Sequence, residues 1–182
     1  MEEHFDVCTS DGEPTGQVLA RSEVHRLGLW HRSSHLWLIN PRREVLLQRR
    51  HPGKETDPGR WDIAVAGHLS AGQTPLQAIV REAWEELGLV LDPGSLTFLG
   101  ATAKEYVAPG FADREWQHLF AGIWDGDIKA LILQPEEVVA ARWMPVEEYQ
   151  KVLVRGSDEH VGRREDWPLF AAWLRKAGIE DI

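Results

Sequence analysis

Three glutamates near the middle of the chain have the spacing of a metal site. Glu82 precedes Glu85 and Glu86 by three and four residues, so a helix would carry all three on one face. Like charges at these spacings destabilise a helix by about 0.2–0.5 kcal/mol per pair, and a bound cation would offset that cost. Carboxylate oxygens with no thiolate nearby suit Mg²⁺ or Mn²⁺ better than Zn²⁺. The alternative is a solvated acidic face that binds no metal.

The residues around the glutamates predict a helix with defined ends. Thr74 suits the N-cap, Pro75 the first helical position and Gln77 the partner in a capping box. Gly88 supplies the left-handed residue that ends a helix. Between these ends we expect a buried stripe made of Leu76, Ile79, Val80, Ala83 and Leu87. The glutamates then lie at the polar edge of this stripe.

This segment resembles the Nudix box, G-x5-E-x7-R-E-U-x-E-E-x-G-U, in which U is an aliphatic residue. The matching residues are Gly67, Arg81, Glu82, Ala83, Glu85, Glu86, Gly88 and Leu89. The departure is Gln73, which stands where the family has its first glutamate. The resemblance implies an α/β Nudix fold, with a mixed β-sheet sandwiched between α-helices. It also implies hydrolysis of a diphosphate linkage in a nucleoside di- or triphosphate or another organic diphosphate.

The resemblance also implies roles for individual residues. The Mg²⁺ ligands (Mn²⁺ is the other candidate) would be Gly67, Glu82, Glu85 and Glu86. Arg81 would hold the carboxylates in place, and either Glu82 or Glu115 would orient or deprotonate the attacking water. Gln73 leaves two possibilities, because an amide keeps the size and one acceptor oxygen but removes a charge. Either its loss costs modest activity, or the chain is a diphosphate-binding sensor with little turnover.

Outside the box the chain resembles isopentenyl-diphosphate isomerase and its hydrolase relatives, through EVHRLGLWHRSSHLWLIN, LLQRR and PGRWDIAVAGH. This resemblance implies a second metal site, whose matching residues are His25, His31, His68, Asp113 and Glu115. The alternative is that the histidines are surface or hydrogen-bonded residues, inherited with the fold, that bind no metal. The spacing from His25 to His31 is one residue shorter than in the isomerase. Arg50 and Lys54 match basic residues that hold the diphosphate there.

The same comparison argues against isomerase activity. The isomerase uses a cysteine two residues before the histidine that His68 matches, and this chain has Ala66 there. Its single cysteine, Cys8, lies far upstream. The three box glutamates, which the isomerase generally loses, are all present. A Mg²⁺-dependent hydrolase is therefore favoured over a sensor, and an isomerase is the third alternative.

Length and composition agree with one globular domain. The 182 residues predict a single domain, with an N-terminal strand and extension at 1–32, a core at 33–150 and a C-terminal helix at 151–182. A net charge of −9 argues against binding nucleic-acid polymers or anionic membranes. The expected partner, a small-molecule diphosphate, is the one that the Nudix resemblance implies. No spanning segment or signal peptide is recognisable, so a cytoplasmic location is expected. The oligomeric state is left open.

Alternating strands and helices predict an α/β fold, with some strands antiparallel because their connections are short. A polar turn is expected at 10–16, and one of the nine tryptophans, Trp116, is the best placed to stack on a base. The expected strands are His4–Thr9, His35–Asn40, Val45–Arg49, Trp61–Ala66, Leu96–Tyr106, Glu115–Trp124 and Val139–Met144. Helices are expected from Pro145 and from Asp166 to Gly178.

Overall fold

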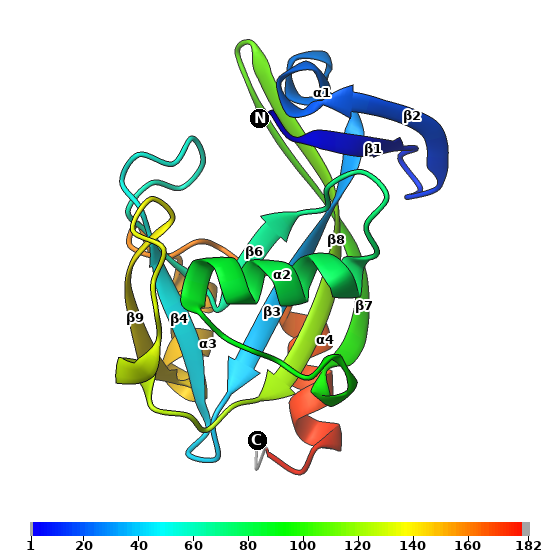
Figure 1. The fold of residues 1–182 in the computed structure, drawn as a ribbon. Coiled ribbons are helices and arrows are strands. Elements are labelled where there is room, and N and C mark those ends of the chain that lie inside the picture. Colours follow the sequence, from blue (N-terminus) through cyan, green and yellow to red (C-terminus); the bar gives the residue numbers. More distant parts are fainter. Residues whose placement is uncertain (1, 180–182) are drawn as a thin grey trace.

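The computed structural model describes residues 2–179, in which nine strands form one sheet with four α-helices around it (Figure 1). Met1 and residues 180–182, which the single-domain prediction includes, lie outside the described part. In chain order the elements are β1 His4–Cys8, β2 Pro14–Ala20, α1 Arg21–Leu27, β3 Trp30–Ile39, β4 Glu44–Arg50, β5 Trp61–Ile63, β6 Val65–His68, α2 Pro75–Leu87, β7 Thr97–Ala108, β8 Phe111–Ile123, β9 Val138–Pro145, α3 Val146–Arg155 and α4 Trp167–Lys176, with single 3-10 turns at Pro93–Ser95 and Ile128–Ala130.

Strand β3 lies at the centre of the mixed sheet. It pairs in parallel with β8, from Trp30 opposite Arg114 to Ile39 opposite Ile123. It pairs antiparallel with β1, β4 and β6, while β7 continues the sheet beyond β8, and β5 and β9 both pair with β4. The predicted α/β class is confirmed, and β3 and β4, both expected as strands, pair as a hairpin.

Alternate residues of β3 face two separate hydrophobic cores, because successive side chains of a strand point to opposite faces. Leu36 and Leu38 pack with α2 on one face. Trp37 and Ile39 pack with α3 and α4 on the other. In Figure 1, α2 crosses the near face of the sheet while α3 and α4 lie behind it. The sandwich of helices around a mixed sheet is therefore confirmed.

Helix α2 begins and ends as its sequence predicts. The Thr74 side chain accepts a hydrogen bond from the Gln77 amide, Gln77 bonds back to Thr74, and Gly88 ends the helix with a φ of 67°. One expectation is wrong: Glu86 does not lie at the polar edge but is buried, with 7% of its surface exposed. A carboxyl group therefore sits among core side chains.

The N-terminal segment contains two elements that the sequence did not predict. The polar turn expected at 10–16 gives way at Pro14 to strand β2, and α1 follows it directly. A small separate core made of Phe5, Val7 and Val24 holds this segment together. The strand expected over Trp61–Ala66 is also divided, since β5 and β6 are interrupted at Ala64. In the described part of the chain, no helix is long and apolar enough to cross a bilayer.

Candidate active site and metal centres

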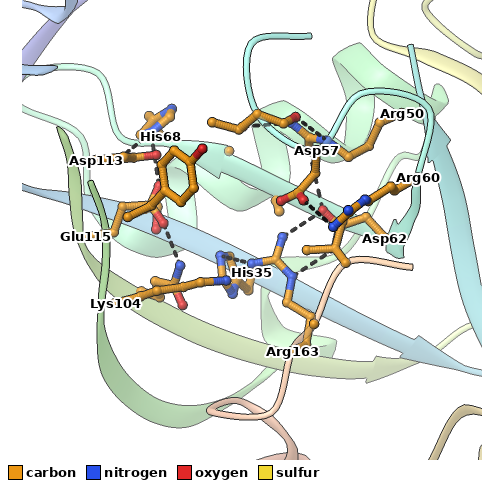
Figure 2. A pocket seen from close by; sticks show the side chains of 18 of the residues that line it. His35, Arg50, Asp57, Arg60, Asp62, His68, Lys104, Asp113, Glu115 and Arg163 are labelled. Atoms are coloured by element: carbon orange, nitrogen blue, oxygen red, sulfur yellow. Dashed lines mark hydrogen bonds and ion pairs between the residues drawn. The ribbon is translucent and has the colours of Figure 1, made fainter. Parts of the chain in front are cut away.

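A cavity of about 630 Å³ opens where β3, β6, β7 and β8 meet (Figure 2). Every second residue of β8 faces it: Asp113, Glu115 and Gln117. The strand register places Lys104 and Tyr106 of β7 opposite Glu115 and Asp113, so these side chains share that face. One end of the cavity is therefore lined by carboxylates and histidine, and its floor by further polar groups.

Four side chains at this end converge on one point. His25 lies in the last turn of α1, His31 on β3, His68 at the end of β6 and Asp113 on β8. One ligand atom from each lies within 4.8 Å of the others. Asp113 Oδ1 is 3.3 Å from His31 Nε2 and 3.8 Å from His25 Nε2. His25 and His31 meet although their spacing in the sequence is one residue shorter than in the isomerase. Gly28, at a φ of 63°, turns the chain from α1 back toward β3.

The facing atoms of this cluster are buried and lack hydrogen-bond partners among the described residues: Nε2 of His25, His31 and His68, and Oδ1 of Asp113. His68 Nε2 does lie 3.0 Å from Glu115 Oε1, within ion-pair distance. Burial, which outweighs the attraction of Asp113, lowers the pKa of His25 to about 4, so its ring is neutral at pH 7. Imidazole nitrogens that face a carboxylate fit a divalent cation, and they favour a transition metal over Mg²⁺.

Glu115 joins this cluster to the cavity. Burial alone would raise the pKa of Glu115, but its contact with His68 outweighs burial and holds the pKa well below its usual range. The pKa of His68 is shifted in the opposite direction. Burial alone would lower this pKa, but the interaction with Glu115 raises it above its usual value. Glu115 also accepts a hydrogen bond from Gln117. The carboxylate is therefore ionised and held in place at the boundary between cluster and cavity.

The Nudix-box residues form a second acidic group on α2. Arg81 donates hydrogen bonds to Glu82 at 2.8 Å and to Glu85 at 2.6 Å. The Glu82 carboxylate packs directly against Gly67, where an added Cβ would lie 2.6 Å from its Cδ. Burial, which outweighs the charge of Arg81, raises the pKa of Glu82. Gly67, Arg81, Glu82 and Glu85 are thus brought together as predicted.

Glu86 lies beside this group in a more apolar position. The only hydrogen bond to its carboxylate from the described residues comes from Gln48, at 3.0 Å. Burial, followed by the charge of Glu82, raises the pKa of Glu86 to about 8. An ionised carboxylate at this depth needs a positive partner. Two carboxyl groups with raised pKa values on one helix, the partly buried Glu82 and the buried Glu86, therefore fit a divalent cation.

Gln73 contacts the same arginine. Its Oε1 accepts hydrogen bonds from the Ser70 amide at 3.0 Å and from Arg81 Nη2 at 3.4 Å. Both bonds need only an acceptor oxygen, which an amide and a carboxylate share. The residue that departs from the box thus joins the glycine loop to the arginine that holds Glu82.

The two predicted diphosphate-binding residues lie in different places. Arg50 lines the cavity and donates to the Thr56 carbonyl at 3.0 Å and to Asp62 at 3.4 Å. Lys54 forms an ion pair with Glu137 on the Glu86 side and does not line the cavity. Trp116 lies outside the cavity too, because it packs on Gly12 and donates to the Ser10 carbonyl. Nothing in these contacts supports base stacking by Trp116.

A buried charged network on the cavity floor was not predicted. Arg163 makes two hydrogen bonds to Asp62, at 2.8 and 2.7 Å, and a third to His35 Nε2 at 3.1 Å. A guanidinium only donates, so His35 Nε2 accepts and the Nδ1 proton goes to Asp166, 2.8 Å away. Burial would raise the pKa of Asp62, but Arg163 outweighs it and holds that pKa well below its usual range. No local sequence pattern signals contacts across such separations.

Comparison with known proteins places this fold and site in one family. The NUDIX domain family matches residues 29–164. Nudix hydrolase 3 of Arabidopsis thaliana is 39% identical over 165 residues, which cover 88% of this chain but only 21% of that protein. The chain thus spans about a fifth of the length of this plant relative. The isopentenyl-diphosphate Delta-isomerase of Streptomyces coelicolor is 31% identical, over 93% of this chain and 79% of the isomerase.

A solved structure agrees on the fold. The crystal structure of a Deinococcus radiodurans protein superposes with a TM-score of 0.66 at 19% identity, covering 96% of this chain and 98% of that one. Sheet, box helix and acidic centre are those of a Nudix-type enzyme. The chain belongs to the Nudix family. The predicted family, fold and enzyme class are confirmed, and so is the resemblance to the isomerase branch.

Proposed function

We propose that this chain hydrolyses a diphosphate linkage in a small organic or nucleoside diphosphate, with Mg²⁺ or Mn²⁺ bound by the box glutamates. The observation that carries the proposal is the state of Glu86, a buried carboxyl group whose pKa of about 8 reflects burial and the neighbouring Glu82. Ionising such a buried carboxyl group costs free energy unless a cation binds beside it. Gly67, Glu82 and Glu85 lie in the same assembly and complete the proposed ligand set.

In the proposed reaction, a water oxygen bonds to phosphorus as a phosphorus–oxygen bond of the diphosphate breaks. The departing phosphate keeps the electron pair of the broken bond, and the water proton passes to a carboxylate. Glu82 and Glu115 are the two candidates for that carboxylate: Arg81 holds the first, and the second lines the cavity. Arg50 lines the same cavity and would contact the phosphoryl oxygens. A bound divalent cation would neutralise charge on those oxygens.

We also propose that the second cluster, His25, His31, His68 and Asp113 with Glu115 beside it, holds a metal ion. The support is its buried, unpartnered ligand atoms. Because three of its ligands are imidazoles, we expect a transition metal there and Mg²⁺ or Mn²⁺ at the glutamates. The cluster would also fix the orientation of Glu115 through His68.

The structure favours hydrolysis over the two alternatives. Against a sensor, Gln73 already supplies the acceptor oxygen that Arg81 and the Ser70 amide use. Against an isomerase, Ala66 lines the cavity where the isomerase has its cysteine, and Cys8 lies buried on β1 away from the cavity lining. Protonation at carbon therefore lacks the thiol that the isomerase uses.

The experiment is a phosphate-release assay with Mg²⁺ or Mn²⁺ over nucleoside di- and triphosphates, dinucleotides and isoprenoid diphosphates. Glu86→Gln should lower kcat by about a hundredfold or more while the circular dichroism spectrum is unchanged. The matched control is Glu136→Gln, since Glu136 is exposed, and its rate should equal that of the wild type. Full turnover by Glu86→Gln would remove the metal assignment. Tight binding of one compound, with release from none, would favour the sensor.

A further inference from the structure

The cavity floor carries polar groups that the proposed hydrolysis does not use. Lys104, on β7, reaches into the cavity beside Glu115 and His35 (Figure 2). Ser33 and Gln117 lie opposite one another on β3 and β8 and line the same floor. Together they form a polar floor, defined here as Ser33, Lys104 and Gln117.

Lys104 differs from the three arginines of the cavity because its side chain has no hydrogen-bond or ion-pair partner among the described residues. Arg163 is bonded to Asp62, and Arg60 forms an ion pair with Asp57 at 3.0 Å. Arg50 is bonded to Thr56 and Asp62. Within residues 2–179 the side chain of Lys104 makes no hydrogen bond and no ion pair, and its charge acts on the Asp166 carboxylate only from a longer distance. Its ammonium group is thus the cation that can meet a ligand anion without breaking an existing contact.

The other two floor residues each carry an unpaired polar atom. Ser33 Oγ and Gln117 Oε1 are buried and have no hydrogen-bond partner in residues 2–179. Buried polar atoms are normally paired, so an unpaired donor and acceptor that line the same cavity as the Lys104 ammonium group indicate a ligand with matching groups. An apolar chain laid on this floor would strip water from all three groups and return no hydrogen bond.

We infer that the substrate of this cavity carries an anionic group, a carboxylate or a second phosphate, at the end remote from the diphosphate. Lys104 binds this anion, and Ser33 and Gln117 bond to a neighbouring hydroxyl. This inference rests on the proposed function, since it assumes that the diphosphate lies between Arg50 and the box. The volume of about 630 Å³ leaves room for such a substrate, since ligand pockets generally measure about 300–1,000 Å³. The floor thereby selects against unsubstituted isoprenoid diphosphates.

The test compares diphosphates with and without an anionic group at the remote end. Isopentenyl diphosphate is the apolar probe, and mevalonate 5-diphosphate adds a carboxylate and a hydroxyl to a similar carbon skeleton. Phosphoribosyl diphosphate supplies the phosphate-bearing arm, which separates the two sources of the anion. We expect kcat/KM for one acid-bearing probe to exceed that for isopentenyl diphosphate by about a hundredfold or more.

Lys104→Met should remove most of that preference and leave turnover of isopentenyl diphosphate within about twofold. Lys104→Arg should keep the preference, since it keeps the charge. Lys151→Met, on the exposed side of α3, is the matched control. Lys104→Gln replaces Lys104→Met if the latter shows a lowered melting temperature. Equal rates with all probes, or an equal loss with all probes in Lys104→Met, would overturn the inference.

Calorimetric binding of the methylene-diphosphonate analogues separates this inference from the proposed hydrolysis. If no probe is hydrolysed but the acid-bearing analogue binds at least about tenfold more tightly, and Lys104→Met abolishes the difference, hydrolysis is wrong and the anion site stands. If the probes are hydrolysed without preference, hydrolysis stands and the anion site is wrong.

Discussion

The carboxylate of Glu82 occupies the space that a side chain at position 67 would need. A Cβ added to Gly67 would lie 2.6 Å from Cδ and 2.8 Å from Oε1 of Glu82. No Cβ is tolerated at such distances, so the glycine permits the strand end and the helix carboxylate to touch. The close approach brings the backbone of β6 and the acidic face of α2 into one site.

Gly67→Ala should therefore displace Glu82 and lower kcat by about 10- to 100-fold. The free energy of unfolding should fall by about 1–3 kcal/mol, as is usual for overpacking. Gly94→Ala is the control, because a Cβ there meets no atom closer than 3.4 Å. Steady-state kinetics and urea denaturation measure both effects. Unchanged kinetics in Gly67→Ala would show that the position of Glu82 does not limit the reaction.

Gln73→Glu should change kcat/KM by less than about tenfold, because the carboxylate would accept the same bonds from Ser70 and Arg81. Gln73→Leu removes both acceptor contacts and should cost about 10- to 100-fold, as for other residues that orient a metal ligand. The two variants should be compared under identical metal concentrations. A gain of about a hundredfold or more in Gln73→Glu would instead mark the natural chain as a weakly active binder.

Metal analysis of the purified protein should find one transition-metal ion per chain that survives gel filtration. His31→Gln should lose it, because His31 is fully buried and contributes one of three imidazoles. Glu86→Gln should retain it, since Glu86 belongs to the glutamate site. Mass spectrometry of the native protein distinguishes these cases. Loss of the ion in both variants would indicate one shared site.

Stability should decrease in acid because of Asp62. Arg163 holds the pKa of Asp62 below its ordinary value of 3.8, so the folded state favours the ionised form. A lowered folded-state pKa stabilises the protein fully above the unfolded pKa, and this stabilisation is lost as pH falls through the folded pKa. The free energy of unfolding should thus drop steeply below about pH 4. Asp62→Asn should show a shallower decrease over the same range.

Replacing Arg163 alone tests the ion pair between Arg163 and Asp62 through its second member. Arg163→Met leaves Asp62 buried without its main partner and should cost about 3–5 kcal/mol in unfolding free energy. The double variant Asp62→Leu with Arg163→Met should recover most of this loss, because no unpaired charge remains. Thermal denaturation at pH 7 provides the comparison. A double variant as unstable as Arg163→Met alone would show that the unpaired charge of Asp62 is not what destabilises the single variant.

The sequence predicts best where the determinants are local. Thr74, Gln77 and Gly88 fix the ends of α2 through contacts within one turn, and the structure has them all. Strand β2 was missed because most of its residues are exposed and carry no alternating pattern. The bond between His35 and Asp166 joins residues 131 positions apart, so no motif signals it. The burial of Glu86 was missed for a related reason, since it depends on Gln48 of β4 and its surroundings.

The positions of the histidine-cluster residues in the sequence affect where an expression fragment of this protein should begin. Its members are contributed at positions 25, 31, 68 and 113, whereas the family match begins at residue 29. An expression fragment that starts at the family boundary would keep the whole Nudix box and discard His25 together with α1. Such a fragment would retain one proposed metal centre and carry an incomplete second one. We therefore expect that a fragment intended to hold both proposed centres must include the N-terminal extension.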